Sequence, residues 1–196
     1  QAELKLPHIF GDHMVFQQDK PIHVWGWATA GQEVTANWAG QTRKATATPK
    51  GTWSVHFDPV KASFDGRKLV ISNGPKSITI ADILVGEVWL CGGQSNMEWT
   101  LRSTRDADLE IDSADYPAIR FIRLPKVARL TPQQDFPVEN PENPVGNWRL
   151  ATTQQVENCS GVGYYFARRL HRHLKVPIGL IDTSWGGTMA QHWVSQ

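Results

Sequence analysis

The sequence has little net charge and no long apolar run. Its 20 lysines and arginines oppose 19 aspartates and glutamates, which leaves a formal net charge of +1. Such a balance provides no electrostatic field for binding nucleic acid or an anionic membrane. No apolar stretch approaches the roughly 18 residues that a membrane-spanning helix needs. We therefore expect neither nucleic acid nor a membrane among the partners of this chain.

Cysteine is equally scarce, with only Cys91 and Cys159 in 196 residues. Two isolated cysteines form neither a zinc-binding nor a redox spacing. The glycine patterns that bind nucleotides and the HExxH pattern that binds zinc are also missing. These absences predict a protein without a metal or a cofactor. The two cysteines are either buried thiols or, in an exported protein, a disulfide.

Tryptophan, by contrast, is abundant, because the chain contains nine. Large aromatic side chains commonly fill cores and interfaces, but an exposed indole can also stack on the ring of a sugar. Four of the nine, Trp25, Trp27, Trp38 and Trp53, lie in the first third of the chain. The composition thus leaves two interpretations open, core packing and a carbohydrate ligand.

Residues 1–82 carry the pattern of an all-β domain. Short segments of alternating apolar and polar residues are separated by turn residues, which is typical of a sandwich or a small barrel. The predicted strands span residues 24–27, 33–38, 42–48, 53–57, 68–72 and 77–80. We expect a β-sandwich-like domain over residues 1–82.

Residues 83–196 predict an α/β domain. Residues 83–91 are almost continuously apolar, which is typical of a parallel strand buried on both faces. Further strands are expected at residues 119–124 and 178–182, and a helix over residues 97–111. Residues 125–149, with prolines at 125, 132, 137, 141 and 144, predict a long loop. The order of these elements favours a parallel sheet, which is incomplete because the chain ends shortly after its third strand.

A second helix is expected to begin after Ser160, a capping residue, and to end near Lys175. Apolar residues recur there every four positions and give the helix an apolar stripe, made by Val162, Phe166, Leu170 and Leu174.

Ser95 stands where the first predicted parallel strand gives way to a helix. In open α/β sheets, ligand sites lie beyond the carboxyl ends of the strands. Gly92 and Gly93 let the backbone turn sharply, and a helix beginning just after Ser95 would direct free N–H groups at an oxyanion. A nucleophilic serine needs these conditions. A serine that only caps a helix would show the same spacing, and the segment departs from the G-x-S-x-G elbow at Met97.

A second glycine-rich segment, residues 184–188, follows the strand at residues 178–182. If the two strands are neighbours, the N–H group of Gly186 or Gly187 could join that of Ser95 around an oxyanion. A plain glycine-rich turn is the alternative. A serine nucleophile also needs a base, and His192 is the histidine nearest to this segment in the sequence. No carboxylate stands in an Asp-x-x-His relation to any of the seven histidines.

Together these segments resemble the sialate O-acetylesterase family of carbohydrate esterases, within the SGNH hydrolases. The resemblance is carried by residues 12–17, 21–26, 85–91, 93–99, 162–166, 176–181 and 184–188. Its most specific part is the Gln-Ser-Asn-Met block at residues 94–97. The resemblance implies an incomplete SGNH-hydrolase domain with a flavodoxin-like sheet over residues 83–196. It also implies a serine esterase that removes acetyl groups from sugar hydroxyls.

The resemblance also assigns roles to residues. It implies that Ser95 is the nucleophile and that Gly187, or its neighbour Gly186, supplies an oxyanion-hole N–H. Gln94 and Asn96 flank the nucleophile and are expected to bind the substrate. The family's oxyanion asparagine and its Asp-x-x-His base come later in its sequence and are absent here. The family also has a small or acidic pair where this chain has Gln191-His192. A C-terminal segment or a second chain is therefore expected to complete the site.

Three hypotheses follow. The leading one is an esterase acting on sialic acid or another acetylated carbohydrate through an acetyl-Ser95 intermediate, with its base outside these residues. The second is a non-catalytic carbohydrate-binding module formed by the tryptophans of residues 1–82. The third is an esterase that His192 completes within this chain. Because the chain begins with Gln1 rather than Met and the resemblance is to an enzyme of glycans, we expect an extracellular or periplasmic location.

Overall fold

The computed structural model describes residues 3–138 and 145–194. Its strands are β1 (Val15–Gln17), β2 (Ile22–Trp27), β3 (Glu33–Trp38), β4 (Gln41–Thr46), β5 (Thr52–Phe57), β6 (Ser63–Asn73), β7 (Lys76–Cys91), β8 (Asp115–Arg123), β9 (Arg149–Thr152) and β10 (Ile178–Asp182). Its helices are α1 (Ser95–Glu98), α2 (Ala107–Asp112) and α3 (Gly161–Leu174), with short 3₁₀ helices η1 (Leu101–Ser103), η2 (Val156–Asn158) and η3 (Ala190–Trp193).

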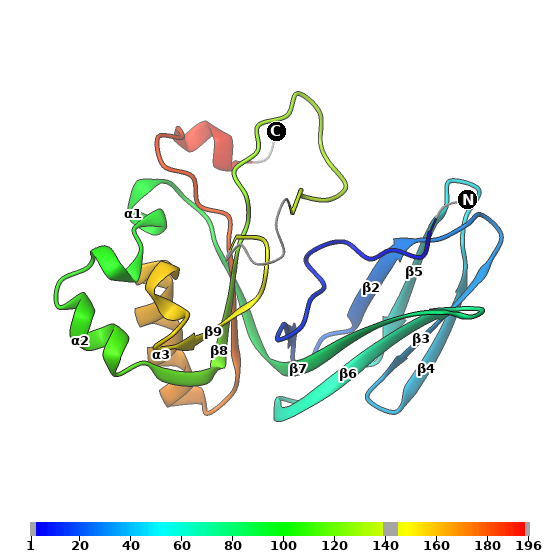
Figure 1. The fold of residues 1–196 in the computed structure, drawn as a ribbon, viewed down its shortest axis with the longest axis horizontal. Helices are drawn as coiled ribbons and strands as arrows, with labels where there is room; N and C mark the ends of the chain where they lie inside the picture. The colour runs from blue at the N-terminus through cyan, green and yellow to red at the C-terminus, as the bar shows by residue number, and fades with distance from the viewer. Residues whose placement is uncertain (1–2, 139–144, 195–196) are drawn as a thin grey trace.

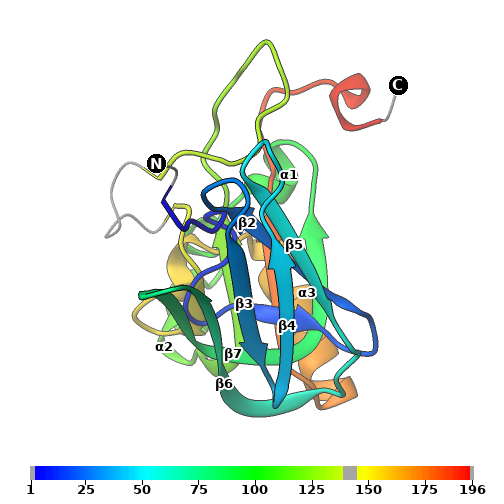
Figure 2. The same ribbon diagram turned by 90° about the vertical axis from the view of Figure 1, so that its right-hand side faces the viewer.

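The first part of the chain forms two packed β layers, as the alternating pattern predicts. β2 pairs with β5 in one layer, and β4, β3, β6 and β7 follow one another in the other. Every second side chain of β3 and β5 is buried, among them Val34, Trp38, Val55 and Phe57. Alternate residues of a strand point to opposite faces, so these side chains meet between the layers. Figure 2 shows the strands of this part in front of the rest of the molecule.

The long strand β7 belongs to both parts of the molecule. Its first half pairs antiparallel with β6, and residues 87–91 pair parallel with β10. The predicted strands at residues 77–80 and 83–91 are therefore one continuous strand, and the proposed boundary at residue 82 lies inside it. Asp82 adopts a left-handed conformation with φ +52°. Its carboxylate accepts hydrogen bonds from His13 (2.7 Å) and Arg120 (3.0 Å), which ties the bend to β8.

The second part is a layer of three parallel strands, β7, β10 and β8, with β9 antiparallel at the edge. In Figure 1 the helices lie on one face of this layer and the β layers of the first part on the other. The strand order differs from the expected flavodoxin-like order, in which the first strand lies between the second and the third. Here β10 lies between β7 and β8, and β1 pairs with β7 through Leu84–Gly86.

The predicted helix over residues 97–111 is wrong. The segment breaks into α1, η1 and α2, because Thr100 and Thr104 are extended and Asp106 has a φ of +55°. Thr100 forms a bridge with Ser160 at the start of α3. This tertiary pairing prevents a continuous helix, which a local pattern could not show. The predicted loop over residues 125–149 is confirmed for residues 125–138 and 145–148, whereas residues 139–144, with Pro141 and Pro144, lie outside the described residues.

Helix α3 begins where Ser160 predicts, and the hydroxyl of this residue accepts a hydrogen bond from the Gly163 N–H (3.1 Å). The side of α3 that faces the sheet is formed by Gly163, Tyr164 and Ala167. The predicted apolar stripe is instead largely exposed, including Val162, Phe166 and Leu174. In the described residues the helix thus has one apolar side on the sheet and a second one facing solvent.

Candidate active site

Ser95 lies directly beyond the carboxyl end of β7, as predicted. β7 ends at Cys91, Gly93 turns the chain with a φ of +136°, and Ser95 is the first residue of α1. The side chain of Ser95 is exposed, and no described residue forms a hydrogen bond with its hydroxyl. Helix α1 has only four residues. A helix this short has only a small dipole. Any stabilisation of an oxyanion here would therefore come from hydrogen bonds donated by individual backbone N–H groups.

The glycine-rich loop after β10 lies beside Ser95, as expected for neighbouring strands. Backbone hydrogen bonds join the two loops, from Thr183 N–H to the Cys91 carbonyl (3.1 Å) and from Trp185 N–H to the Gly93 carbonyl (2.9 Å). A Cβ atom built on Gly186 would lie 3.6 Å from the Cα of Ser95. The loop therefore approaches the serine with its backbone, and a side chain at this position would fill the space beside the hydroxyl.

The two glycine N–H groups are in different situations. The Gly186 N–H donates to Oε2 of Glu98 at 2.5 Å, so it is not free for an oxyanion in this structure. Gly187 has a φ of +80° and open space where a Cβ would stand. The described residues provide no partner for its N–H. Gly186 is the glycine that lies against Ser95, and which of the two N–H groups would donate to an oxyanion stays a prediction.

Two ion pairs surround this loop, and the sequence did not reveal them. Glu98 pairs with Lys126, and Asp182 at the end of β10 pairs with Arg123 (3.4 Å). The hydrogen bond from Lys126 lowers the pKa of the Glu98 carboxyl, and the Gly186 N–H and Arg123 lower it further. One local signal existed for Asp182, because it stands at the carboxyl end of a predicted parallel strand. No pattern indicated that Glu98 would turn toward Gly186.

The other predicted site residues are exposed around Ser95. Gln94 and Asn96 face solvent on either side of the nucleophile. His192 lies in η3, where its Nδ1 accepts a hydrogen bond from the Met189 N–H (3.1 Å). A histidine base must reach the serine hydroxyl with one ring nitrogen. No hydrogen bond joins His192 to Ser95 among the described residues, so its proposed role stays a prediction.

The two cysteines are free thiols in the structure. Cys91 and Cys159 are both buried, at the end of β7 and before α3. Burial raises the pKa of the Cys91 thiol to about 11, with a contribution from Asp182. Burial also raises the pKa of Cys159. Both groups are therefore protonated at neutral pH and serve as small apolar side chains beneath the site.

The four tryptophans of the first part divide into two pairs. Trp38 and Trp53 are 1% and 3% exposed and belong to the core. Trp25 and Trp27 stand on the outer side of β2 and line a cavity of about 440 Å³. His23, Thr52, Ser54 and Gln134 are among the other residues that line it.

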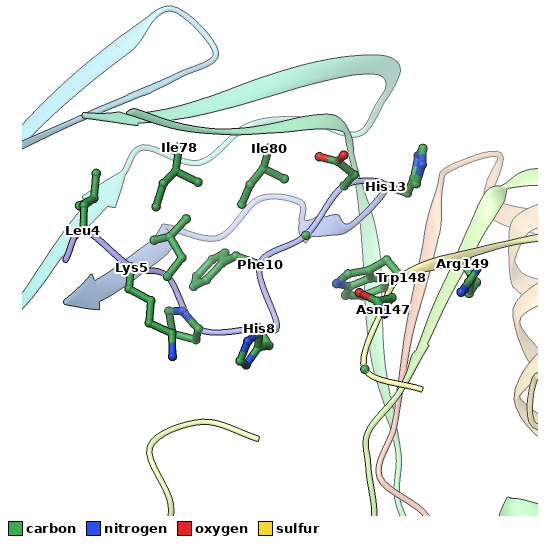
Figure 3. A pocket seen from close by; sticks show the side chains of 15 residues that line it. Leu4, Lys5, His8, Phe10, His13, Ile78, Ile80, Asn147, Trp148 and Arg149 are labelled. Atoms are coloured by element: carbon green, nitrogen blue, oxygen red, sulfur yellow. The ribbon is translucent and has the colours of Figure 1, made fainter. Parts of the chain in front are cut away.

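Another cavity, of about 540 Å³, lies between the N-terminal segment and the strands of the first part (Figure 3). Its lining is mainly apolar at one end, where Phe10, Ile78 and Ile80 stand. The histidines at its rim already have partners, since His8 pairs with Asp135 and His13 with Asp82. None of the residues that line it belongs to the loops around Ser95. We therefore assign it no part in the candidate active site.

Among residues 3–138 and 145–194, no three histidine, cysteine or acidic side chains gather in a way that could hold a metal ion. None of the helices described here has the length and apolarity to cross a membrane.

The family model described as "Carbohydrate esterase, sialic acid-specific acetylesterase" matches residues 85–196. The chain is 31% identical to a rat protein named sialate O-acetylesterase over 94% of its own length, and 29% identical to the human protein of that name over 96%. A crystal structure of a carbohydrate acetylesterase from Xanthomonas citri superposes with a TM-score of 0.92 at 30% identity, over 98% of this chain.

The chain spans less than half the length of these relatives. It covers 36% of the rat protein, 38% of the human protein and 43% of the Xanthomonas chain. The matched region nevertheless includes both loops of the candidate site, around Ser95 and Gly187. The chain belongs to the carbohydrate esterase family of the sialic acid-specific acetylesterases.

Proposed function

We propose that this chain carries the nucleophile of a serine esterase that removes O-acetyl groups from a sugar. The observation that supports it most directly is the position of Ser95. Its hydroxyl is exposed beyond the carboxyl end of β7, which pairs parallel with β10, and the backbone of Gly186 lies alongside. Relatives named as carbohydrate or sialate acetylesterases are consistent with an acetylated sugar as substrate.

The proposed reaction has two steps. A histidine base takes the proton of the Ser95 hydroxyl, and the oxygen attacks the acetyl carbonyl. The N–H groups of Ser95 and Gly187 stabilise the oxyanion, and the sugar oxygen leaves with the proton held by the base. Water, activated by the same base, then cleaves the acetyl-Ser95 ester and releases acetate. Gln94 and Asn96, exposed next to the nucleophile, are the proposed contacts to the sugar.

We further propose that the base lies outside these 196 residues, in a C-terminal segment of a longer polypeptide or in a second chain. Ser95 has no hydrogen-bonded base among the described residues, and the relatives are more than twice as long as the matched region. Losing a general base removes a large part of the rate of a serine hydrolase. The 196-residue chain alone should therefore be close to inert.

An open strand edge supports this proposal. Leu84 N–H bonds to β1 and Glu87 N–H to the residue before β10, so β1 and β10 lie on opposite edges of β7. β1 pairs as far as Gly86, the Gln17 side chain accepts the Val88 N–H (2.8 Å), and no described strand continues along that edge. Nearby, the exposed ring of Trp89 packs edge-on against Phe166 of α3 (5.0 Å between ring centroids). A strand edge that no described strand covers beyond Gly86, beside exposed apolar rings, is suited to receive a further strand and helix.

A fluorophosphonate, which labels only activated serines, tests the proposal by intact mass. We expect no adduct on the 196-residue chain and one adduct on a polypeptide of the relatives' full length. Ser95→Ala should remove that adduct, and the control Ser113→Ala, at the end of α2, should retain it. An adduct on the 196-residue chain that disappears in His192→Ala would replace the proposed base with His192. An adduct that persists in Ser95→Ala would contradict the proposal.

A glycan-binding role of the first part is the second candidate function. Burial of Trp38 and Trp53 removes two of the four tryptophans from this hypothesis. Trp25 and Trp27 remain candidates for stacking on a sugar, because they line an open cavity together with residues that carry hydroxyl and amide groups. Titrating the chain with acetylated oligosaccharides should quench tryptophan fluorescence, and Trp25→Ala should abolish the change. A flat titration of the intact chain would contradict this candidate. For either function we propose an extracellular or periplasmic location.

A further inference from the structure

Two carboxylates accept hydrogen bonds from the glycine-rich loop beside Ser95. Oε2 of Glu98, on α1, accepts the Gly186 N–H at 2.5 Å. Oδ1 of Asp182, at the end of β10, accepts the Ser184 N–H at 2.9 Å and the Ser184 hydroxyl at 2.5 Å. Hydrogen bonds to ionised groups are roughly twice as strong as neutral ones. Two alternate N–H groups of the loop are thus fixed, and that of Gly187 is left without a partner among the described residues.

Each carboxylate has its own cation, and both cations come from the end of β8 and the loop that follows it. Lys126 pairs with Glu98, and Arg123 pairs with Asp182 at 3.4 Å. Asp182 is 5% exposed and Glu98 is about one quarter exposed by its side chain. A buried or half-buried carboxylate without a partner would be costly. These cations allow negative charges to remain next to a nucleophile.

We infer that Glu98 and Asp182 are positioning residues that fix residues 184–187, the loop whose Gly186 lies against Ser95, so that the Gly187 N–H stays free to donate to an oxyanion. The inference rests on the proposed esterase function, in which that N–H stabilises an oxyanion. Glu98 has a further effect, because by taking the Gly186 N–H it decides which of two adjacent glycines is the donor. The acid is thus a determinant of the oxyanion hole without touching the substrate.

Lys126 and Arg123, the cations paired with these carboxylates, also support the proposed oxyanion hole. An oxyanion develops close to Glu98, and two like charges in a partly buried site repel each other. Lys126 and Arg123 reduce this repulsion, since both lower the pKa of Glu98 and keep it ionised without leaving its charge uncompensated. Removing Lys126 should therefore harm the transition state more than removing both members of the Lys126–Glu98 pair.

The first test needs no catalysis. In the 196-residue chain, the amide proton resonance of Gly186 should titrate with Glu98, with a midpoint below the ordinary carboxyl value of 4.5. Lys126→Met should raise that midpoint, because the first cause of the lowered pKa is removed. At pH 7, Glu98→Ala should move the Gly186 resonance upfield and leave that of Gly163, bound to Ser160, in place. A Gly186 resonance that does not respond to either variant would overturn the inference.

The second test measures acetyl release by the full-length polypeptide. Misplacing an oxyanion donor by about 1 Å costs roughly a hundredfold in rate. We therefore expect Glu98→Ala to lower kcat by about tenfold to a hundredfold with KM changed less than about twofold. Glu98→Gln keeps an acceptor for the Gly186 N–H and should recover most of the loss. The double variant Lys126→Met with Glu98→Gln should be faster than Lys126→Met alone.

Glu110→Gln is the matched control, because Glu110 forms an ion pair with Arg168 away from the site. It should leave kcat within about twofold of the parent value. A kcat for Glu98→Ala equal to that of this control would overturn the inference. Absence of a Ser95 adduct in the parent full-length polypeptide contradicts the esterase proposal, whereas an unresponsive Gly186 resonance contradicts the positioning role. The two failures are therefore distinguishable.

Discussion

The two regions joined by β7 differ in how far their large apolar side chains are buried. In the first, Trp38, Phe57 and Leu69 are buried between two β layers. In the second, Trp89 and Phe166 remain 41% and 40% exposed, beside an edge of β7 along which β1 pairs only as far as Gly86. A protein surface seldom carries neighbouring exposed rings unless they meet a partner. The first region therefore has a closed core, and the second has a core on one side and exposed aromatic rings on the other.

Substitution of Trp38 tests the closed core and should have the largest effect. Its ring packs against Phe16 at 5.0 Å and is 1% exposed. Trp38→Ala should lower the free energy of unfolding by about 3–5 kcal/mol. Trp89→Ala, on the open side, is the matched control and should cost less than about 1.5 kcal/mol. Urea denaturation followed by circular dichroism measures both, and equal losses would contradict the contrast between the regions.

The junction between the regions depends on Asp82 and Arg120. Arg120 is 4% exposed, and Asp82 partners it at 3.0 Å. Asp82→Asn keeps the left-handed backbone accessible but removes the charge. We expect a loss of about 2 kcal/mol, below the 3–5 kcal/mol of a fully buried pair because Asp82 is partly exposed.

The same pair predicts an acid-dependent stability. Burial alone would raise the pKa of Asp82, but hydrogen bonds from His13 and Arg120 lower it below its ordinary value of 3.8. A carboxyl with a lowered folded-state pKa contributes stability that is complete above its ordinary pKa and lost as pH falls through the folded value. The difference between the parent and Asp82→Asn should be constant above about pH 5 and shrink below 3.8. Guanidinium unfolding at several pH values measures it, and a difference that grows on acidification would refute this assignment.

Ser160 connects the site to α3 and should have a smaller effect. Its hydroxyl caps the helix and also donates to the Met97 carbonyl at 2.6 Å. Ser160→Ala should cost about 1–2 kcal/mol. Ser113→Ala removes a hydroxyl at the exposed end of α2 and should cost less than about 0.5 kcal/mol. Thermal unfolding measures the Tm of both variants. Equal losses of Tm would contradict the stabilising role of Ser160 at the start of α3.

The smallest effect on stability is expected on the open side. Phe166→Asn should change the free energy of unfolding by less than about 1 kcal/mol. It should nevertheless reduce binding of the dye ANS and lower self-association in light scattering, because an exposed apolar ring is removed. Tyr164→Asn, two residues earlier and fully buried, should instead cost more than about 2 kcal/mol. Unchanged ANS binding in Phe166→Asn would argue that the exposed apolar side of α3 is not the surface that binds the dye.

The comparison also explains which parts of the structure could be predicted from the sequence. Alternation identified β3 and β5 because one face of each is buried and the other exposed. The position of Ser95 followed from an apolar strand that ends at two glycines. Strand order could not be predicted, because β10 pairs with both β7 and β8 through contacts between residues far apart in the sequence. The stripe on α3 was identified, but its orientation was not, since Tyr164 and Ala167 form a second apolar side.

The candidate site was predictable only in its backbone. Glycine at positions 186 and 187 indicated a close approach, and the structure places that loop against Ser95. Which glycine N–H stays free depends on Glu98, whose carboxylate reaches across 88 positions of sequence to Gly186. Contacts between residues so far apart produce no periodic pattern in the sequence. The same is true of Lys126, which belongs to a proline-containing loop with no regular pattern.

The continuity of β7 restricts how the gene for this chain can change length. Side chains of a strand alternate between faces, so inserting one codon between the two pairing regions would turn Cys91 toward the opposite layer and bring Trp89 with it. Insertions and deletions in β7 should therefore be tolerated only in pairs, whereas the loop between β8 and β9 can gain or lose single residues. In a random codon-insertion library selected for folding, residues 83–91 should accept insertions of two residues but not of one. Residues 127–138 should accept both.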